Sequence, residues 1–332
     1  MKNNSTYSLN DVLKELDVNK IYSFYALVSG VDKGVDRTGN NYLNLKLVAK
    51  DSAINAKKWH VTSSEAEILK EGKLVLVFGK VREYRNLPQF NIDNAETVND
   101  TSLWKVLLPQ PPIDIEVLKK ELLFFFEEIT DTDYHQVIKH VFDNKTLESF
   151  CQVRGGLRIH HNVFGGLLWH TVSILKAAKA LLPIYHYLPI NASLLYAGII
   201  LHDFGKIAEI GDYFQNTYSM EGKLLGHIVI ASQKIEEIGK KLSINKTKLL
   251  LLQHLVLSSH GKLENASPRE PMVLEAFLLS QLDNLDAKMS MLSNNFQNLD
   301  NQHLTAGFSL NNEHSIRRVK FWKHTLGEIK EK

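Results

Sequence analysis

Residues 201–206 are Leu201-His202-Asp203-Phe204-Gly205-Lys206, where a long apolar run ends in two potential metal ligands. Neighbouring residues on a helix project about 100° apart, so His202 and Asp203 can both reach one ion at a helix end. Lys206 follows three residues later and offers a cation for a phosphate group, unless it is a solvated surface lysine. The segment therefore predicts a metal site for a phosphate-bearing substrate, at the end of a buried helix.

Further histidines and aspartates in the same half of the chain fall on apolar helix faces. His170 lies between Leu167 and Ile174 at helical spacing, and His227 and Asp283 have comparable positions. One such histidine is more often a satisfied core residue than a ligand. Several on separate helices favour a metal site, because converging imidazoles and carboxylates are how helical bundles bind transition metals.

The first hundred residues have a different pattern, with short runs of alternating apolar and polar residues. These runs predict five strands, at residues 22–31, 42–48, 54–61, 74–84 and 89–98, with one helix at 63–70. A helix between the third and fourth of five strands is typical of an OB-fold barrel, which often binds single-stranded nucleic acid on one face. A barrel with a purely structural role is the alternative.

A proline cluster, Pro109, Pro111 and Pro112, separates this barrel from a second half whose pattern is helical. Helices are predicted at residues 118–129, 134–150, 167–182, 192–202, 224–242, 246–257 and 272–291. We therefore expect a multi-domain protein, an all-β barrel followed by an all-α bundle. The expected boundaries are 1–105 for the barrel, 106–156 for a linker and leading helices, 157–292 for the metal-dependent domain and 293–332 for a helical tail.

Composition excludes several classes of protein. The chain is 44% hydrophobic and carries a net charge of +2, so binding of nucleic acid requires a local basic surface and cannot come from bulk charge. The single cysteine, Cys151, excludes an internal disulfide framework and a Cys-rich zinc site, and it favours the cytoplasm. No segment approaches the roughly 20 apolar residues of a membrane span, so no membrane partner is expected.

The order His170, His202-Asp203, Asp283 resembles the H…HD…D signature of the HD phosphohydrolase superfamily. Longer segments are similar to the YhaM-type family, also called CMP-binding factors: residues 165–171, 225–228, 257–261, 275–276 and 283–288, with Trp59 and 79–85 in the barrel. Members of that family carry an OB-fold before the HD domain. The resemblance implies a metal-dependent 3′-to-5′ exoribonuclease of single-stranded RNA, with some activity on single-stranded DNA.

The resemblance also implies the ligands of one or two divalent ions, with Mn²⁺ as the expected metal. The first ligand group is His170, His202, Asp203 and Asp283, and the second ligand group is Asp203, His227 and His260. Asp203 would bridge the two ions, and a metal-activated water would attack the phosphodiester, with Lys206 stabilising the phosphoryl charge. His160 and His161 are assigned to phosphate binding or proton transfer, with capping or packing as the alternative.

Three positions depart from the family pattern. Family members usually have an acidic residue at the position of Trp169 and histidines at the positions of Ser259 and Ser280. The change at Ser259 leaves the first ligand group intact and puts binding of the second ion in question. Two other functions therefore stay open: a nucleic-acid-binding protein whose HD domain is catalytically weakened, and an HD nucleotidase or phosphodiesterase that acts on small nucleotides.

Contacts to RNA are expected from basic and aromatic residues of the barrel. The preferred group is Lys80, Arg82, Tyr84, Arg85 and Phe90, and a plain hairpin with solvated charges is the alternative. Residues 317–323 also mix cations with aromatics, and we interpret this tail as a packing helix or as part of a homo-oligomer interface.

Overall fold

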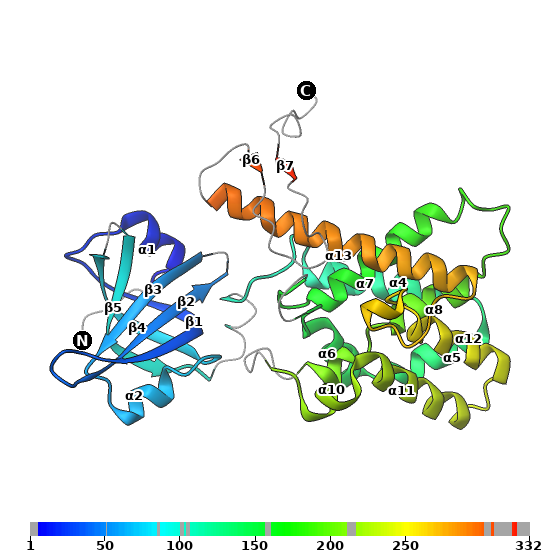
Figure 1. Ribbon diagram of the computed structural model, residues 1–332, viewed down its shortest axis with the longest axis horizontal. Helices are drawn as coiled ribbons and strands as arrows, with labels where there is room; N and C mark the ends of the chain where they lie inside the picture. Colours follow the sequence, from blue (N-terminus) through cyan, green and yellow to red (C-terminus); the bar gives the residue numbers. More distant parts are fainter. Residues whose placement is uncertain are drawn as a thin grey trace. The chain divides into compact units, whose positions relative to one another are not determined.

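The computed structural model describes residues 6–50, 52–84, 87–99, 103, 107–156, 161–210, 217–301, 307–308 and 321–323. Two compact units are present: the barrel unit ends at Gln110 and the helical unit begins at Pro111 (Figure 1). Each unit has its own hydrophobic core.

The barrel unit contains five strands that close on themselves in the order β1-β2-β3-β5-β4. These are β1 (Ile21–Val35), β2 (Asn41–Ala49), β3 (Ser52–Trp59), β4 (Leu74–Tyr84) and β5 (Leu87–Thr97), with helix α2 (Ser63–Ile68) between β3 and β4. Neighbouring strands pair antiparallel except β3 and β5, which are parallel. This order and the place of α2 confirm the predicted OB-fold barrel.

Alternate residues of each strand point into the barrel. This alternation shows that one residue predicted to contact RNA lies in the core. Phe90 is fully buried and packs edge-on against Phe24 with ring centroids 4.8 Å apart. The prediction that Phe90 contacts RNA is therefore wrong, because its side chain points into the core. Its neighbours Gln89 and Asn91 face outward instead, as the two-residue period of a strand requires.

Helix α1 (Leu9–Glu15) precedes the barrel and was not expected from the sequence. Ser8 caps it by accepting a hydrogen bond from the backbone N–H of Asp11. Leu9 and Val12 are buried with the apolar residues of the barrel, so α1 covers part of that core.

The helical unit confirms the predicted all-α architecture. Its main helices are α4 (Ile115–Glu127), α5 (Thr132–Val141), α6 (Asn144–Gln152), α7 (Gly166–Leu181), α8 (Ala192–Leu201), α9 (Lys206–Glu209), α10 (Met220–Leu225), α11 (His227–Lys241), α12 (Lys246–Leu257) and α13 (Leu274–Asn301). A 3₁₀ turn, Leu263–Asn265, and a pair of two-residue strands, β6 (Gly307–Phe308) and β7 (Trp322–Lys323), complete the described elements. Among the described residues, no helix has the length and apolar character needed to cross a bilayer.

Helix α8 lies at the centre of this unit, since residues 193–201 are all buried. A helix that is apolar on every side must be surrounded by others, and α5, α7, α12 and α13 pack against it. The end of α8 therefore delivers the next residues, His202 and Asp203, into the interior.

Two helices predicted as continuous are broken in the structure. The predicted helix 134–150 is interrupted at Phe142, because Asp143 caps α6 by accepting from the backbone N–H of Thr146 at 2.7 Å. The predicted helix 224–242 is interrupted at Gly226, whose φ of 75° is incompatible with a continuing helix. As a consequence His227 is the first residue of α11.

Glu65 is expected to stabilise the barrel through the capping box of α2. Its carboxylate accepts from the Thr62 N–H and lies 2.9 Å from Lys58 Nζ, and these contacts lower the pKa of Glu65 to about 2 from a usual 4.5. Glu65→Gln should destabilise the barrel by about 1–2 kcal/mol at neutral pH. Hydrogen exchange of barrel amides in the full chain measures this difference.

The sign of the pH dependence follows from the lowered pKa of Glu65. Its contribution to stability is complete above about pH 4.5 and is lost as the pH falls toward 2, because the unfolded chain binds the proton first. Glu67→Gln is the matched control, since Glu67 lies in the same helix and pairs only with exposed Lys70 among the described residues. An equal effect of both substitutions would refute the capping role.

Candidate metal centre

The centre is built around the residues that follow α8. His202 and Asp203 are 0% and 2% exposed, and His202 keeps helical backbone angles directly after Leu201. The Nδ1 atom of His202 lies 2.7 Å from the Ile199 carbonyl, and because a carbonyl only accepts, Nδ1 must donate. The free electron pair of His202 is therefore on Nε2, which points into the centre.

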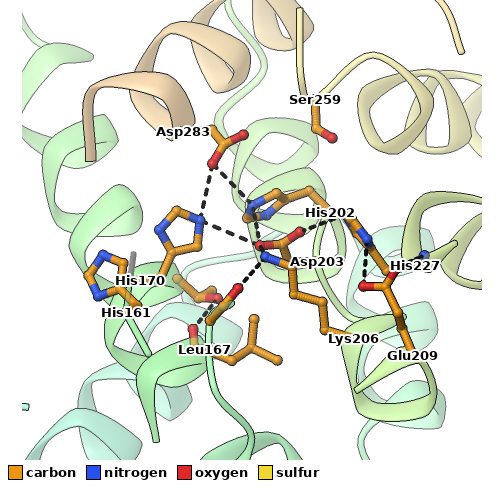
Figure 2. Close-up of polar contacts among 12 residues, drawn as sticks. His161, Leu167, His170, His202, Asp203, Lys206, Glu209, His227, Ser259 and Asp283 are labelled. Atoms are coloured by element: carbon orange, nitrogen blue, oxygen red, sulfur yellow. Dashed lines mark hydrogen bonds and ion pairs between the residues drawn. The ribbon is translucent and has the colours of Figure 1, made fainter. Parts of the chain in front are cut away.

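The structure brings the four residues of the first ligand group together (Figure 2). His170 Nε2 lies 3.1 Å from Asp283 Oδ1 and 3.5 Å from Asp203 Oδ2. His202 Nε2 lies 3.4 Å from Asp203 Oδ2 and 3.9 Å from Asp283 Oδ1. The atoms come from α7, the end of α8 and α13, and they converge on one point.

The second ligand group also converges. His227 Nε2 lies 3.3 Å from Asp203 Oδ1, and the rings of His227 and His260 are 5.4 Å apart. Ligand atoms of these three residues lie within 4.8 Å of one another. Asp203 thus offers Oδ2 to the first group and Oδ1 to the second, which is the geometry of a bridging carboxylate.

The donors suit a divalent metal ion. His202 Nε2, His227 Nε2 and Asp203 Oδ1 are buried and have no hydrogen-bond partner within the part of the chain that the structure describes. Unpaired buried polar atoms are costly, and an ion bound to them would remove that cost. A nitrogen and oxygen donor set fits manganese, iron, zinc or cobalt.

The carboxylates of the centre are held in their ionised form. Burial by itself raises the pKa of Asp203, but the charge of Lys206 outweighs it and holds the pKa well below its usual range. Burial likewise raises the pKa of Asp283, and the contact with His170 lowers it to about 2. Both side chains are therefore negatively charged at neutral pH, as metal ligands must be.

His170 and His227 bind protons more strongly than an ordinary imidazole. Burial lowers the pKa of His170, but its bonds to Asp283 and Asp286 raise it to about 10. His227 follows the same pattern, with contacts to Asp203 and Glu209 that raise its pKa to about 9. An ion that binds to Nε2 of these rings must displace a proton, so its uptake releases protons and weakens as the pH falls.

Lys206 holds Asp203 in place. The lysine is 7% exposed, and its Nζ donates to Asp203 Oδ2 at 2.6 Å and to the Gly155 carbonyl at 2.5 Å. The alternative of a solvated surface lysine is therefore excluded. Its ammonium compensates a buried negative charge, and a contact with a phosphoryl oxygen stays a prediction.

His161 is buried beside the first ligand group and does not face open solvent. It is 2% exposed, its Nε2 lies 2.6 Å from Asp286 Oδ2, and its ring packs edge-on against Trp169 with centroids 4.4 Å apart. His160 lies outside the described residues. These contacts join His161 to Asp286 and Trp169 and do not bring it to a substrate. Its role in phosphate binding or proton transfer stays a prediction.

Two carboxylates were missed by the sequence interpretation. Asp286 Oδ2 lies 2.6 Å from His170 Nδ1, and Glu209 Oε2 lies 2.8 Å from His227 Nδ1. Glu209 also accepts from the backbone N–H of His227 at 3.1 Å. The position of Asp286 three residues after Asp283, on the same helix face, was a usable signal.

Ser259 and Ser280 are turned toward their own backbone. Ser259 is fully buried and donates to the Val256 carbonyl at 3.0 Å, and Ser280 donates to the Phe277 carbonyl at 2.8 Å. The second ligand group therefore consists of three protein residues among those described, and Ser259 adds no imidazole to it.

Gly205 is needed for the position of His227. A Cβ atom at Gly205 would collide with the backbone carbonyl of His227, so the glycine permits the close approach of α11. Gly205→Ala should push the start of α11 away from Asp203 and destabilise the helical unit by about 1–3 kcal/mol. The measurement is the amount of Mn²⁺ retained after dialysis, together with the thermal unfolding midpoint.

Gly30→Ala is the control for this substitution, because a Cβ there meets only the Lys46 Cβ, at 3.9 Å. Gly205→Ala should retain less metal than either wild type or Gly30→Ala. Wild-type retention in Gly205→Ala would show that the contact between Gly205 and His227 does not set the second ligand group.

Comparison with known proteins defines the class. The family model of the HD domain matches residues 168–288, which include every residue of both ligand groups. An OB-fold barrel followed by a helical domain with this centre makes the protein an HD-superfamily hydrolase with an appended barrel.

Two relatives identify the family. The 3′-5′ exoribonuclease YhaM of Geobacillus sp. (strain WCH70) is 34% identical over 278 residues, which are 83% of this chain and 85% of that protein. The protein of the same name from Bacillus pumilus (strain SAFR-032) is 31% identical over 314 residues, 94% of this chain and 98% of that protein. The chain belongs to the YhaM family.

Solved structures with some likeness to the chain include two OB-fold domains. The second OB-fold domain of replication protein A from Methanococcus maripaludis is 18% identical, with a TM-score of 0.23 over 29% of this chain and 98% of that chain. The OB domain of Ta0387 from Thermoplasma acidophilum is 11% identical, with a TM-score of 0.23 over 31% of this chain and 90% of that chain.

Proposed function

We propose that the protein is a divalent-metal-dependent 3′-5′ exoribonuclease that hydrolyses single-stranded RNA, with single-stranded DNA as a further substrate. The observation that carries this proposal is Asp203, whose two carboxylate oxygens each take part in a separate ligand group. Membership of the YhaM family supplies the class of substrate and the direction of cleavage.

The first ligand group would hold one ion and the second ligand group another, with Mn²⁺ as the proposed metal. A bound divalent ion lowers the pKa of a coordinated water toward neutrality and stabilises charge on phosphoryl oxygens. The protein contributes ionised carboxylates, Lys206 that keeps Asp203 charged, and imidazoles whose Nε2 atoms face the centre. Binding of the second ion is weaker in this proposal, because Ser259 offers no nitrogen donor.

Water is the proposed nucleophile. Burial raises the pKa of the Cys151 thiol to about 11, so this cysteine stays protonated at neutral pH and is a poor nucleophile. The serines at 259 and 280 are buried and bonded to carbonyl oxygens. A direct attack by water on the phosphodiester fits these surroundings.

Asp203→Asn should abolish hydrolysis while the helical unit stays folded. An amide keeps the size of the side chain, but it removes the negative charge and replaces one of the two oxygens that join the ligand groups. The rate should therefore fall by more than the roughly 100-fold seen for outer partners of a metal site. The assay is digestion of 5′-labelled single-stranded RNA with Mn²⁺, in which shortening proceeds from the 3′ end.

Glu236→Gln is the control for this assay, because Glu236 forms a surface ion pair with Lys240. Wild type and Glu236→Gln should give the same ladder of products. Turnover by Asp203→Asn near the wild-type rate would refute the metal centre, and intact RNA with tight binding by wild type would favour the catalytically weakened alternative. Cleavage of mononucleotides alone would favour the nucleotidase.

The outer face of the barrel is the proposed platform for the RNA strand. Tyr42 on β2 pairs with Trp59 on β3, their rings lie 5.2 Å apart, and Lys57 Nζ lies 3.8 Å from the Trp59 ring and 4.0 Å from the Tyr42 ring. Trp59 is 40% exposed, so a base can stack on it.

The same face continues across β5 to β4. Lys57 is paired with Asn91, and Asn91 is paired with Lys80. In the next row Gln89 is paired with Arg82. The predicted contacts Lys80, Arg82 and Tyr84 therefore stay in the proposal, and Arg85 lies outside the described residues. Amides alternate with cations along these rows, which suits a phosphodiester backbone.

Trp59→Ala should weaken binding of single-stranded RNA about 5- to 100-fold, since stacking of one base on an aromatic side chain contributes about 1–3 kcal/mol. The measurement is fluorescence anisotropy with a labelled oligonucleotide and an Asp203→Asn background, which prevents digestion. Tyr187→Ala is the control, because Tyr187 is 69% exposed but lies in the helical unit. Equal affinity of Trp59→Ala and Tyr187→Ala would show that the aromatic pair is not the platform.

A further inference from the structure

Asp286 lies outside both ligand groups, yet it contacts two histidines through one oxygen. Its Oδ2 lies 2.6 Å from His170 Nδ1 and 2.6 Å from His161 Nε2. A single carboxylate oxygen that lies this close to two ring nitrogens can accept a hydrogen bond from each, so both nitrogens act as donors.

The bond to Asp286 decides which nitrogen of His170 can bind an ion. A neutral imidazole carries one proton, and a proton on Nδ1 leaves the electron pair on Nε2. His170 Nε2 is the atom that faces Asp203 and Asp283. Without an acceptor at Nδ1 the proton could move to Nε2, and that form of His170 cannot bind an ion through Nε2.

His161 in turn holds Asp286. Its backbone φ of 47° is unusual for a residue with a side chain, and such strain persists where neighbouring contacts enforce it. Its N–H donates to Ser290 Oγ at 3.1 Å, and its carbonyl accepts from Gly155 at 3.0 Å. The ring packs edge-on against Trp169.

We infer that Asp286 is a positioning residue for the first ligand group, which fixes the orientation and proton position of His170, and that His161 fixes Asp286. The inference rests on the proposed function, because it requires that His170 Nε2 binds the ion. It assigns His161 to positioning in place of the phosphate contact or proton transfer expected from the sequence.

A third metal ion between His161, His170 and Asp286 is the alternative, since their atoms also lie close enough to hold one. The distances disfavour it. Two ligands on one ion, each about 2.0–2.2 Å from the metal, are separated by about 3 Å or more. The observed separations of 2.6 Å are those of charge-assisted hydrogen bonds.

The test is calorimetric titration of the full chain with Mn²⁺, for wild type and Asp286→Asn. The amide keeps the size of the side chain, but its NH₂ group can donate to His170 Nδ1 and favour the form that does not bind metal. The affinity for the first ion should fall about 10- to 100-fold, as for other outer partners of metal ligands. The visible spectrum of bound Co²⁺ should change as well, because it reports the geometry of the ligands.

A second variant guards against a folding defect. His161→Phe keeps an aromatic ring against Trp169 and removes the donor to Asp286, so the affinity should fall by a smaller factor, about 2- to 10-fold. Glu236→Gln is the control, and it should bind Mn²⁺ as wild type does. Thermal unfolding midpoints measured with a chelator present separate loss of affinity from loss of stability.

The outcomes distinguish the inference from the proposed function. Wild-type affinity and an unchanged Co²⁺ spectrum in both variants would overturn the positioning role and leave the metal centre standing. Failure of wild type to bind Mn²⁺ or Co²⁺ would overturn the metal centre and the positioning role together. A third equivalent of metal, lost in Asp286→Asn, would establish the third ion instead. If Asp286→Asn does not fold, the result for His161→Phe decides.

Discussion

The helical unit is organised around the buried carboxylate of Asp203. An ionised carboxylate in the interior is strongly destabilising unless charges and donors surround it. Lys206 supplies a direct ion pair, while His170, His202 and His227 approach from three other directions. Lys206, His170 and His227 belong to α9, α7 and α11, so the contacts of Asp203 join these three helices at the end of α8.

Contacts outside the two ligand groups orient the imidazoles that face Asp203. The three imidazoles nearest Asp203 each have an oxygen beside Nδ1: Asp286 Oδ2 for His170, the Ile199 carbonyl for His202 and Glu209 Oε2, at 2.8 Å, for His227. Every Nε2 is thereby directed at the centre. Two of these acceptors are carboxylates, which raise the basicity of the rings and strengthen them as ligands. The acceptors, and not the ligands alone, define where an ion would lie.

Periodicity predicted the barrel and the helical bundle, because these depend on patterns of two, three or four residues along the chain. It also placed His170, His202, His227 and Asp283 on inward helix faces, while the division into two ligand groups came from the resemblance to the HD and YhaM-type families. Phe90 was misplaced since neighbouring strand residues face opposite sides, and composition does not reveal which side is inward. The breaks at Asp143 and Gly226 were missed because apolar periodicity continues through a cap. Glu209 could not be found at all, since its contact with His227 requires the fold.

The low net charge of the chain bears on how the barrel would bind RNA. The net charge of +2 cannot attract RNA over a distance, so a barrel that binds RNA would have to concentrate its cations. Lys46, Lys57, Lys80 and Arg82 lie on its outer rows. Each phosphate contact to a single strand contributes about −0.7 to the slope of the logarithm of the binding constant against the logarithm of the salt concentration. Four contacts would therefore give only a modest slope, and a modest electrostatic share of the affinity. Stacking on the aromatic pair would then have to supply much of the affinity. Because stacking tolerates every base, such a platform would hold RNA without reading its sequence, as an enzyme that removes successive nucleotides from one end requires.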